Sequence, residues 1–166
     1  MYLREVRKQI MLTLSRAQSV EEYTQAREII LAYQEWLGMD LCFQGFYAEL
    51  EALETMYGPP SGALILARQE NLVVGCVGLR DLGEGICEMK RMFVLPTHQE
   101  KGLGTRLFEA FMETARELGY RSVRLDTVRR LKAALHLYQK AGFREIEAYR
   151  YNPDPEVLYM QLDIIN

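Results

Sequence analysis

The chain has 166 residues, 49% of them hydrophobic and 26% charged, which predicts a single domain over residues 1–166 with enough apolar mass for a core. Its 20 Lys and Arg residues against 23 Asp and Glu residues give a formal net charge of -3 without a basic tail, so we expect no nucleic-acid or membrane partner. Three cysteines without CxxC spacing and two isolated histidines predict no metal site, and the lack of a long apolar run favours a cytoplasmic location.

The first part of the chain is predicted to form one strand and two helices. The strand covers residues 9–14. Ser19 is followed three residues later by Glu22, the spacing of a capping box, so a helix is expected to begin there and to end at Gly38. Apolar residues at every third or fourth position predict a second helix over residues 46–57, before a Gly-Pro-Pro stop.

From residue 62 onward the pattern is that of strands, interrupted by two helices. The expected elements are strands 63–67, 72–79 and 87–95, a helix 103–118, a strand 122–128, a helix 131–141, and strands 143–149 and 157–164. A crossover through the first of these helices makes strands 87–95 and 122–128 parallel. The fold class is therefore α/β, a central mixed sheet of about seven strands with helices on both faces.

Residues 99–105 read QEKGLGT and place two glycines where a strand passes to a helix. The first amides of a helix have no intrahelical partner, and glycines allow a close approach, so the segment suits a phosphate group. A P-loop is excluded because GxxxxGK is absent, and a dinucleotide fingerprint would need a glycine at Leu107. On these seven residues alone, a turn without a ligand explains the pattern equally well.

A second segment, residues 134–143, reads ALHLYQKAGF. With these two segments the chain resembles the GNAT superfamily of acyl-CoA-dependent N-acetyltransferases. The pyrophosphate loop of that superfamily has the form Gln/Arg-x-x-Gly-x-Gly/Ala, which Gln99, Gly102 and Gly104 match. The later segment matches its second motif, A-x-x-L-Y-x-x-x-G-F, and the order of elements agrees over nearly the whole chain.

The resemblance implies a GNAT-like fold in which a bulge splays strand 87–95 from its parallel neighbour. The pantetheine arm of coenzyme A would lie in the resulting slot, and its pyrophosphate would rest on the glycine loop. Acetyl-CoA is the implied donor co-substrate. The residues that the resemblance assigns to the coenzyme are Met92, Phe93, Val94, Gln99, Glu100, Lys101, Gly102, Leu103, Gly104 and Thr105.

Acetyl transfer to an amine needs a proton acceptor for the amine and a proton donor for the departing thiolate. The resemblance assigns Tyr138 as the donor, and Glu88, at the position of the general base in the histone-modifying branch, as the acceptor. A backbone N–H near Val94 is the expected donor to the carbonyl oxygen. The alternatives are a core aromatic at Tyr138 and, at Glu88, a strand carboxylate paired with Lys90 or Arg91.

One position departs from the superfamily pattern. The second motif often opens with an Asn three residues before its Ala, and Leu131 stands there. A coenzyme contact is therefore missing or supplied elsewhere. A group of basic residues is placed to reach the 3′-phosphate of the coenzyme, although a solvated helix face is the simpler interpretation: Arg129, Arg130, Lys132 and Lys140.

The predicted function is transfer of an acetyl group from acetyl-CoA to the primary amine of a small molecule or amino acid, by direct attack in a ternary complex. The rival hypotheses are a protein N-terminal or lysine acetyltransferase and a non-catalytic acyl-CoA-binding module. The expected partner is a small-molecule amine, and a homodimer is left open. By resemblance, the acceptor pocket would be walled by Trp36, Asp40, Phe46, Tyr47, Tyr149 and Tyr151.

Overall fold

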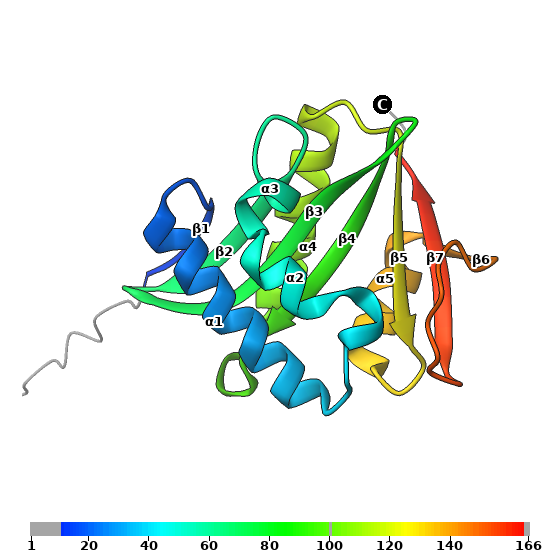
Figure 1. Cartoon of the computed structure of the whole chain (residues 1–166), viewed down its shortest axis with the longest axis horizontal. Coiled ribbons are helices and arrows are strands. Elements are labelled where there is room, and N and C mark those ends of the chain that lie inside the picture. The colour runs from blue at the N-terminus through cyan, green and yellow to red at the C-terminus, as the bar shows by residue number, and fades with distance from the viewer. Residues whose placement is uncertain (1–10, 100, 165–166) are drawn as a thin grey trace, which may run out of the picture.

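The computed structural model of the chain describes residues 11–99 and 101–164 and contains a seven-stranded mixed sheet with helices on both faces (Figure 1). The strands are β1 (Leu12–Arg16), β2 (Ala63–Gln69), β3 (Leu72–Gly83), β4 (Ile86–Val94), β5 (Ser122–Val128), β6 (Arg144–Ile146) and β7 (Val157–Asp163). The helices are α1 (Val20–Leu37), α2 (Phe46–Glu51), α3 (Leu53–Tyr57), α4 (Leu103–Glu117) and α5 (Lys132–Ala141), with 3₁₀ turns η1 (Cys42–Gln44) and η2 (Pro96–His98). The predicted fold class is confirmed.

The strand order is β1-β2-β3-β4-β5-β7-β6. β4 and β5 are parallel, as the crossover through α4 requires, and every other neighbouring pair is antiparallel. The helices α1, α2 and α3 cover one face of the sheet, and α4 and α5 cover the other (Figure 1). The parallel pair therefore lies inside the sheet, with helices on both sides of it.

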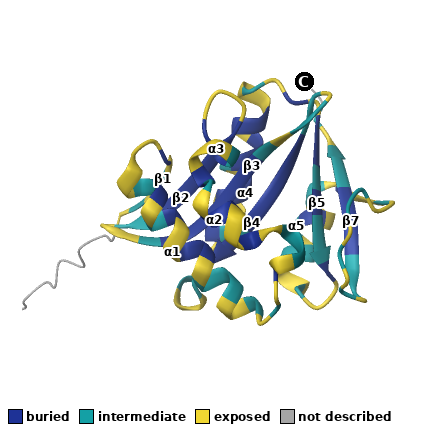
Figure 2. Cartoon of the chain, viewed as in Figure 1, coloured by how far each residue is buried: buried dark blue, intermediate teal, exposed yellow. Residues whose placement is uncertain are grey.

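Each face of the sheet is closed by an amphipathic helix (Figure 2). α4 turns Leu103, Leu107 and Phe111 toward the strands at a spacing of four residues, and all three are buried. α1 buries Ala26 and Ile30 against the opposite face in the same way. Full burial of a Leu, Ile or Phe side chain contributes about 1.5–3 kcal/mol to the stability of the fold. The buried residues of α1 and α4 therefore stabilise the packing of both helices on the sheet.

Two predicted elements near the N-terminus differ from the structure. The first strand covers Leu12–Arg16, and residues 9 and 10 of its predicted range lie outside the described residues. The predicted helix over residues 46–57 is divided at Ala52, whose φ of -126° and ψ of 26° are not helical. The N–H of Ala52 donates to the carbonyl of Glu49, a tighter turn than that of an α-helix, so the two halves are separate helices.

The strand predicted over residues 143–149 is also shorter, because β6 pairs with β7 only from Arg144 to Ile146. Phe143 follows the C-cap of α5, where its N–H donates to the carbonyl of Tyr138 and its ring is buried. The chain then leaves the sheet, and Tyr149 and Arg150 turn back to the interior. No helix within the described ranges is long and apolar enough to cross a membrane.

Candidate active site

α4 begins on the glycine loop that the sequence singled out. Gly102 caps the helix with a φ of 73°, a left-handed conformation that glycine adopts without steric cost. Among the described residues, no side chain caps this end, so the first amides of α4 keep free donors. Apart from its chain neighbours and its own helix backbone, a Cβ atom on Gly104 would meet no atom of the described residues within 4 Å. The open space in front of these amides suits an anionic group.

β4 contains the bulge that the resemblance implied. Phe93 lies opposite Cys76, whereas Lys90 lies opposite Gly78, so two residues of β4 face one residue of β3. Arg91 is one of these two residues of β4, and its φ of 57° is left-handed. That conformation costs a residue other than glycine about 1–2 kcal/mol, which the surrounding structure must offset.

The side chain of Arg91 is held in this place by a buried ion pair. Its Nε donates to Glu49 Oε2 at 2.7 Å and a second guanidinium nitrogen donates to Oε1 at 3.3 Å. The hydroxyl of Tyr57 donates to the same carboxylate at 2.9 Å, and the Phe46 ring centroid lies 5.2 Å from the guanidinium carbon. Burial favours a raised pKa for Glu49, but the charge of Arg91 lowers that pKa below its ordinary value. The ion pair therefore anchors the bulge.

β4 and β5 separate after three paired residues. The pairs run from Ile86 with Ser122 to Glu88 with Arg124, and the later residues of β4 have no partner on β5. Figure 1 shows the two strands diverging from this point. The edge of β4 that faces β5 is consequently free over its second half.

The backbone of Val94 belongs to this free edge. Leu95 donates its N–H to the carbonyl of Val74 at 2.8 Å, so in the alternating pattern of an antiparallel pair the N–H of Val94 points away from β3. The carbonyl of Val94 accepts a hydrogen bond from Gln99 Nε2 at 2.9 Å. Gln99 thus ties the glycine loop to the end of β4 and leaves the N–H of Val94 available.

A groove of about 570 Å³ runs along the free edge to the glycine loop. Eight of the ten residues that the sequence assigned to the coenzyme line it, namely Met92, Phe93, Val94, Gln99, Gly102, Leu103, Gly104 and Thr105. Lys101 is exposed at the loop but is not part of the lining, and Glu100 lies outside the described residues. The structure therefore brings the two predicted parts of the coenzyme site into one surface.

The opposite wall of the groove comes from α5 and the residues before it. Arg130, Lys132 and Lys140 of the predicted basic group line it, but the Arg130 guanidinium is paired with Asp154 at 2.7 Å and Glu156 at 3.0 Å. Lys132 and Lys140 have no ion-pair partner in the described part of the chain. Two lysines are therefore left to attract a phosphate.

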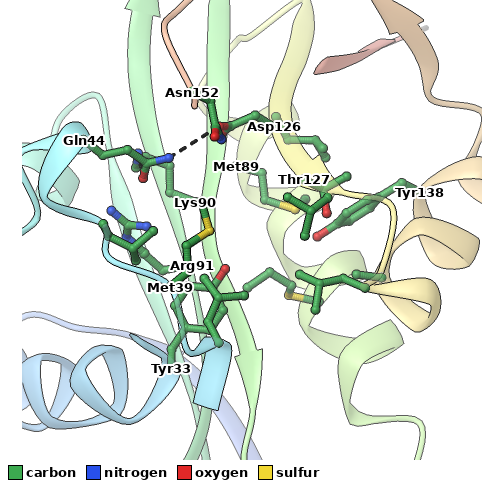
Figure 3. A pocket seen from close by; sticks show the side chains of 17 residues that line it. Tyr33, Met39, Gln44, Met89, Lys90, Arg91, Asp126, Thr127, Tyr138 and Asn152 are labelled. Atoms are coloured by element: carbon green, nitrogen blue, oxygen red, sulfur yellow. Dashed lines mark hydrogen bonds between the residues drawn. The ribbon is translucent and has the colours of Figure 1, made fainter. Parts of the chain in front are cut away.

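A smaller cavity of about 70 Å³ lies between the diverging strands (Figure 3). It shares Tyr33, Met92, Leu131 and Ala134 with the groove, so the two spaces meet at the splay. Leu131, which stands where the superfamily often has Asn, is thus an apolar part of this junction. An extended ligand that lies in the groove would reach the cavity at this junction.

Tyr138 projects from α5 into the cavity, and its hydroxyl points toward the splay (Figure 3). The side chain is 5% exposed, and no described residue forms a hydrogen bond with the hydroxyl. Burial raises the pKa of Tyr138 above its ordinary value, so the phenol keeps its proton at neutral pH. The residue predicted as proton donor is therefore protonated and faces the junction.

Glu88 is fully buried and lines neither the cavity nor the groove. Its Oε2 accepts hydrogen bonds from the hydroxyl of Tyr149 at 2.7 Å and from Arg150. Its Oε1 lies 3.1 Å from Arg80 Nε and 3.7 Å from Lys90 Nζ. The Glu88 carboxylate is thus surrounded by three cations and lies outside the cavity wall. One of the three is Lys90, a predicted ion-pair partner.

One end of the cavity is polar, and of its residues only Lys90 was singled out from the sequence. Asp126 Oδ2 accepts hydrogen bonds from Asn152 Nδ2 at 2.9 Å and from Gln44 Nε2 at 3.4 Å (Figure 3). Lys90 Nζ donates to Gln44 Oε1 at 3.5 Å. The alternation of β5 was a usable signal, because Leu125 is buried in the core and the next residue must face the other side. The sequence held no such signal for Gln44 or Asn152.

The aromatic residues expected to wall the acceptor pocket lie elsewhere. Trp36 lines the groove, Phe46 is in the core, and Tyr47 and Tyr151 are 60% and 74% exposed. Tyr149 bonds to Glu88, as described above. Asp40 is exposed and accepts a hydrogen bond from the N–H of Cys42. No group of metal-ligating side chains was found in the parts of the chain that the structure describes.

Comparison with known proteins identifies the family. The family model for the acetyltransferase (GNAT) family matches residues 21–143, and the chain belongs to this family. An uncharacterized N-acetyltransferase of Schizosaccharomyces pombe is 36% identical over 155 residues, which cover 92% of this chain and 95% of that protein. An IAA acetyltransferase of Azospirillum brasilense is 36% identical over 104 residues, 61% of this chain and 68% of that protein.

Solved structures agree with this assignment at the level of the fold. The crystal structure of a GNAT-family acetyltransferase from Staphylococcus aureus superposes with a TM-score of 0.76 at 22% identity, covering 92% of this chain and 99% of that one. The ribosomal-protein-S18-alanine N-acetyltransferase of Escherichia coli superposes with a TM-score of 0.69 at 18% identity, covering 93% and 94%. The chain is an acyl-CoA-dependent N-acetyltransferase.

Proposed function

We propose that the enzyme transfers an acetyl group from acetyl-CoA to the primary amine of a small molecule or amino acid, by direct attack in a ternary complex. The observation that carries this proposal is the junction of the groove and the cavity at the splay, beside Tyr138. The groove runs from the free edge of β4 to the glycine loop, as a coenzyme arm would require, and the cavity of about 70 Å³ favours a small acceptor.

In this proposal the donor is bound mainly by the main chain. The free amides of the first turn of α4 would hold the pyrophosphate, with Gly104 leaving room for it. The free edge of β4, at Met92, Phe93 and Val94, would pair with the amide groups of the pantetheine arm. Lys132 adds positive charge to the groove.

The acetyl carbonyl would then lie at the junction, where the chain offers a hydrogen-bond donor on each side. The ammonium first gives up one proton; the neutral amine nitrogen then attacks the carbonyl carbon and the C–S bond breaks, while the nitrogen loses a second proton and the sulfur gains one. The N–H of Val94 would stabilise the charge that develops on the carbonyl oxygen. Tyr138 would supply the proton to the sulfur, because its hydroxyl is protonated and faces the cavity.

The acceptor of the amine proton is a separate part of the proposal. Glu88 is the residue that the sequence predicts, and its carboxylate lies behind Lys90 rather than in the cavity wall. A proton would reach it only through Lys90, Tyr149 or a water molecule. Asp126 is the carboxylate that lines the cavity directly.

The test is a pair of measurements on the full chain. Calorimetry with acetyl-CoA should show binding, and a thiol-release assay with a panel of small amines should show turnover with at least one of them. Binding without thiol release from any amine or peptide would support the non-catalytic module instead. Turnover confined to peptides would support the protein-acetylating rival.

A further inference from the structure

The charge cluster around Glu88, beside the polar end of the cavity, carries a surplus of positive charge. Glu88 is a single carboxylate with three cations around it, namely Arg80, Lys90 and Arg150. Both of its oxygens have closer partners than Lys90, because Oε1 lies 3.1 Å from Arg80 and Oε2 accepts from Tyr149 and Arg150. Lys90 is therefore the least compensated of the three cations.

Lys90 is also the cation of this group that lines the cavity. Its side chain is only 4% exposed, yet its ammonium makes one hydrogen bond, to Gln44 at 3.5 Å, and the ion pair with Glu88 is 3.7 Å long. An ammonium has three donors, and a buried cation is costly unless it is paired and hydrogen-bonded. Lys90 thus presents spare donors and a charge that is only partly compensated to the cavity.

Asp126 presents the opposite charge to the same space. Its Oδ2 accepts from two amide groups, those of Asn152 and Gln44, and its Oδ1 accepts no hydrogen bond within the described residues. None of these residues places a cation within ion-pair distance of its carboxylate. The cavity wall therefore contains one cation, Lys90, whose ion pair with Glu88 is long, and one anion, Asp126, which has no ion pair among the described residues.

Gln44 lies between Lys90 and Asp126, and its contacts indicate which ligand groups these two side chains would bind (Figure 3). Its carbonyl oxygen faces Lys90 at 3.5 Å and its amide nitrogen faces Asp126 at 3.4 Å, both at the outer limit of hydrogen-bond length. A ligand with an acceptor and a donor at similar separation, but with full charges, would satisfy both groups better. A carboxylate beside an ammonium has this pattern.

We propose that the acceptor is an amine that carries a carboxylate close to its nitrogen, such as a small α- or β-amino acid, with Lys90 binding the carboxylate and Asp126 binding the ammonium before it loses its proton. This inference rests on the proposed function and narrows its acceptor class. The carboxylate brings the missing negative charge to Lys90, and the amine is placed at the cavity that leads to Tyr138.

The experiment compares matched acceptors with the full-length enzyme and acetyl-CoA. Glycine, alanine, serine and β-alanine are each assayed beside the corresponding carboxamide, which has the same size and an amine but no negative charge. We expect kcat/KM to be at least about tenfold higher for the acids, the effect of one favourable contact of about 1.4 kcal/mol. Equal rates for acids and carboxamides would overturn the inference while leaving the proposed function intact. No thiol release from any acceptor would overturn both.

Three variants test whether Lys90 binds the carboxylate and whether Asp126 binds the ammonium. Lys90→Met should reduce the ratio of the acid rate to the carboxamide rate to about one, whereas Lys90→Arg, which keeps the charge, should preserve the preference. Asp126→Asn should lower kcat/KM for acids and carboxamides alike, because both carry the amine. A folded Lys90→Met enzyme that still prefers acids would overturn the assignment.

Gln44→Glu provides a check that does not depend on removing a buried side chain. Gln44 lies in a partly exposed 3₁₀ turn, and the new carboxylate would occupy the anion position beside Lys90. We expect the acid preference to disappear in this variant as well. Retention of the full preference would place the carboxylate-binding group elsewhere.

Discussion

The groove proposed for the donor and the cavity proposed for the acceptor meet at one junction but are lined by different kinds of groups. One wall of the groove is formed by the end of β4 and the glycine loop, and the specific features of this wall are a missing Cβ and a free strand edge. The polar end of the cavity is formed by charged and amide side chains from η1, β4, β5 and the loop before β7. In the proposed function, the cofactor would therefore be held mainly by backbone groups, whereas the acceptor would be held by side chains.

The first prediction concerns the ionic support of the acceptor side. Glu88→Gln removes the one negative charge that three buried or half-buried cations share. Because an uncompensated buried charge is strongly destabilising, the free energy of unfolding should fall by about 3 kcal/mol, as measured by urea denaturation.

The same variant separates two roles of Glu88. If Glu88 is the proton acceptor, the folded variant should lose turnover and should regain part of it at high pH, where the amine is already deprotonated. A variant with unchanged unfolding free energy would contradict the structural role. Unchanged turnover would remove Glu88 from the catalytic role.

The second prediction concerns the junction itself. Tyr138→Phe should lower kcat by about 100-fold, the lower end of what a general acid contributes, with little change in the affinity for acetyl-CoA. Tyr47→Phe is a matched control, because Tyr47 is 60% exposed and touches neither space. If kcat of the Tyr138 variant equals that of the control, the tyrosine is a packing residue.

The third prediction concerns the donor side alone. Gly104→Val should weaken acetyl-CoA binding by roughly 30-fold, equivalent to about 2 kcal/mol, because its methyl groups would occupy the space in front of the helix amides. The fold should tolerate the change, since a Cβ at Gly104 meets no atom of the described residues within 4 Å beyond its chain neighbours and its own helix backbone, and valine has a higher helix propensity than glycine. Calorimetry gives the affinity, with Gly104→Ala as the smaller step. Wild-type affinity in a folded Gly104→Val enzyme would disprove the loop assignment.

The fourth and smallest effect is a pH dependence on the acceptor side. Burial lowers the pKa of Lys90 to about 8, and the nearby charge of Arg91 acts in the same direction. Its ammonium is therefore present below pH 8 and is lost as the pH rises through 8. The charged groups that face Lys90, directly or through Gln44, are Glu88, Arg91, Arg150, Glu49 and Asp126.

A short carboxylate without an amine isolates this titration from that of the acceptor amine. Its inhibition constant against the acceptor should rise about tenfold between pH 7 and pH 9, because the charged fraction of a group with a pKa of 8 falls by about that factor. In Lys90→Arg the constant should stay level over this range. An inhibition constant that is independent of pH in the wild type would show that Lys90 does not bind the carboxylate.

The difference between the groove and the polar end of the cavity also explains which features could be predicted from the sequence. The glycine loop, the strand before it and the Tyr138 motif are short local patterns, so they predicted the family, the order of elements and eight described residues of the groove. The break at Ala52 depends on a single turn that helical spacing does not reveal. The meeting of Gln44 with Asp126 spans 82 residues of chain and follows only from the folded sheet.

Glu88 illustrates the same limit at one position. Its place on the central strand could be counted from the sequence, but Arg150 lies 62 residues away and Arg80 is brought opposite Glu88 by the pairing of β3 with β4. The cations that surround it belong to tertiary structure. The sequence therefore located the residue without locating its surroundings.

The four residues shared by the groove and the cavity have a consequence for the order of events. A coenzyme arm lying against Tyr33, Met92, Leu131 and Ala134 would close the cavity on the groove side. In the proposed function, the acceptor would then have to reach the cavity from a side other than the groove, so that both substrates could be bound at once. Initial-rate plots against the two substrates should accordingly intersect rather than run parallel, because neither product needs to leave before the second substrate enters.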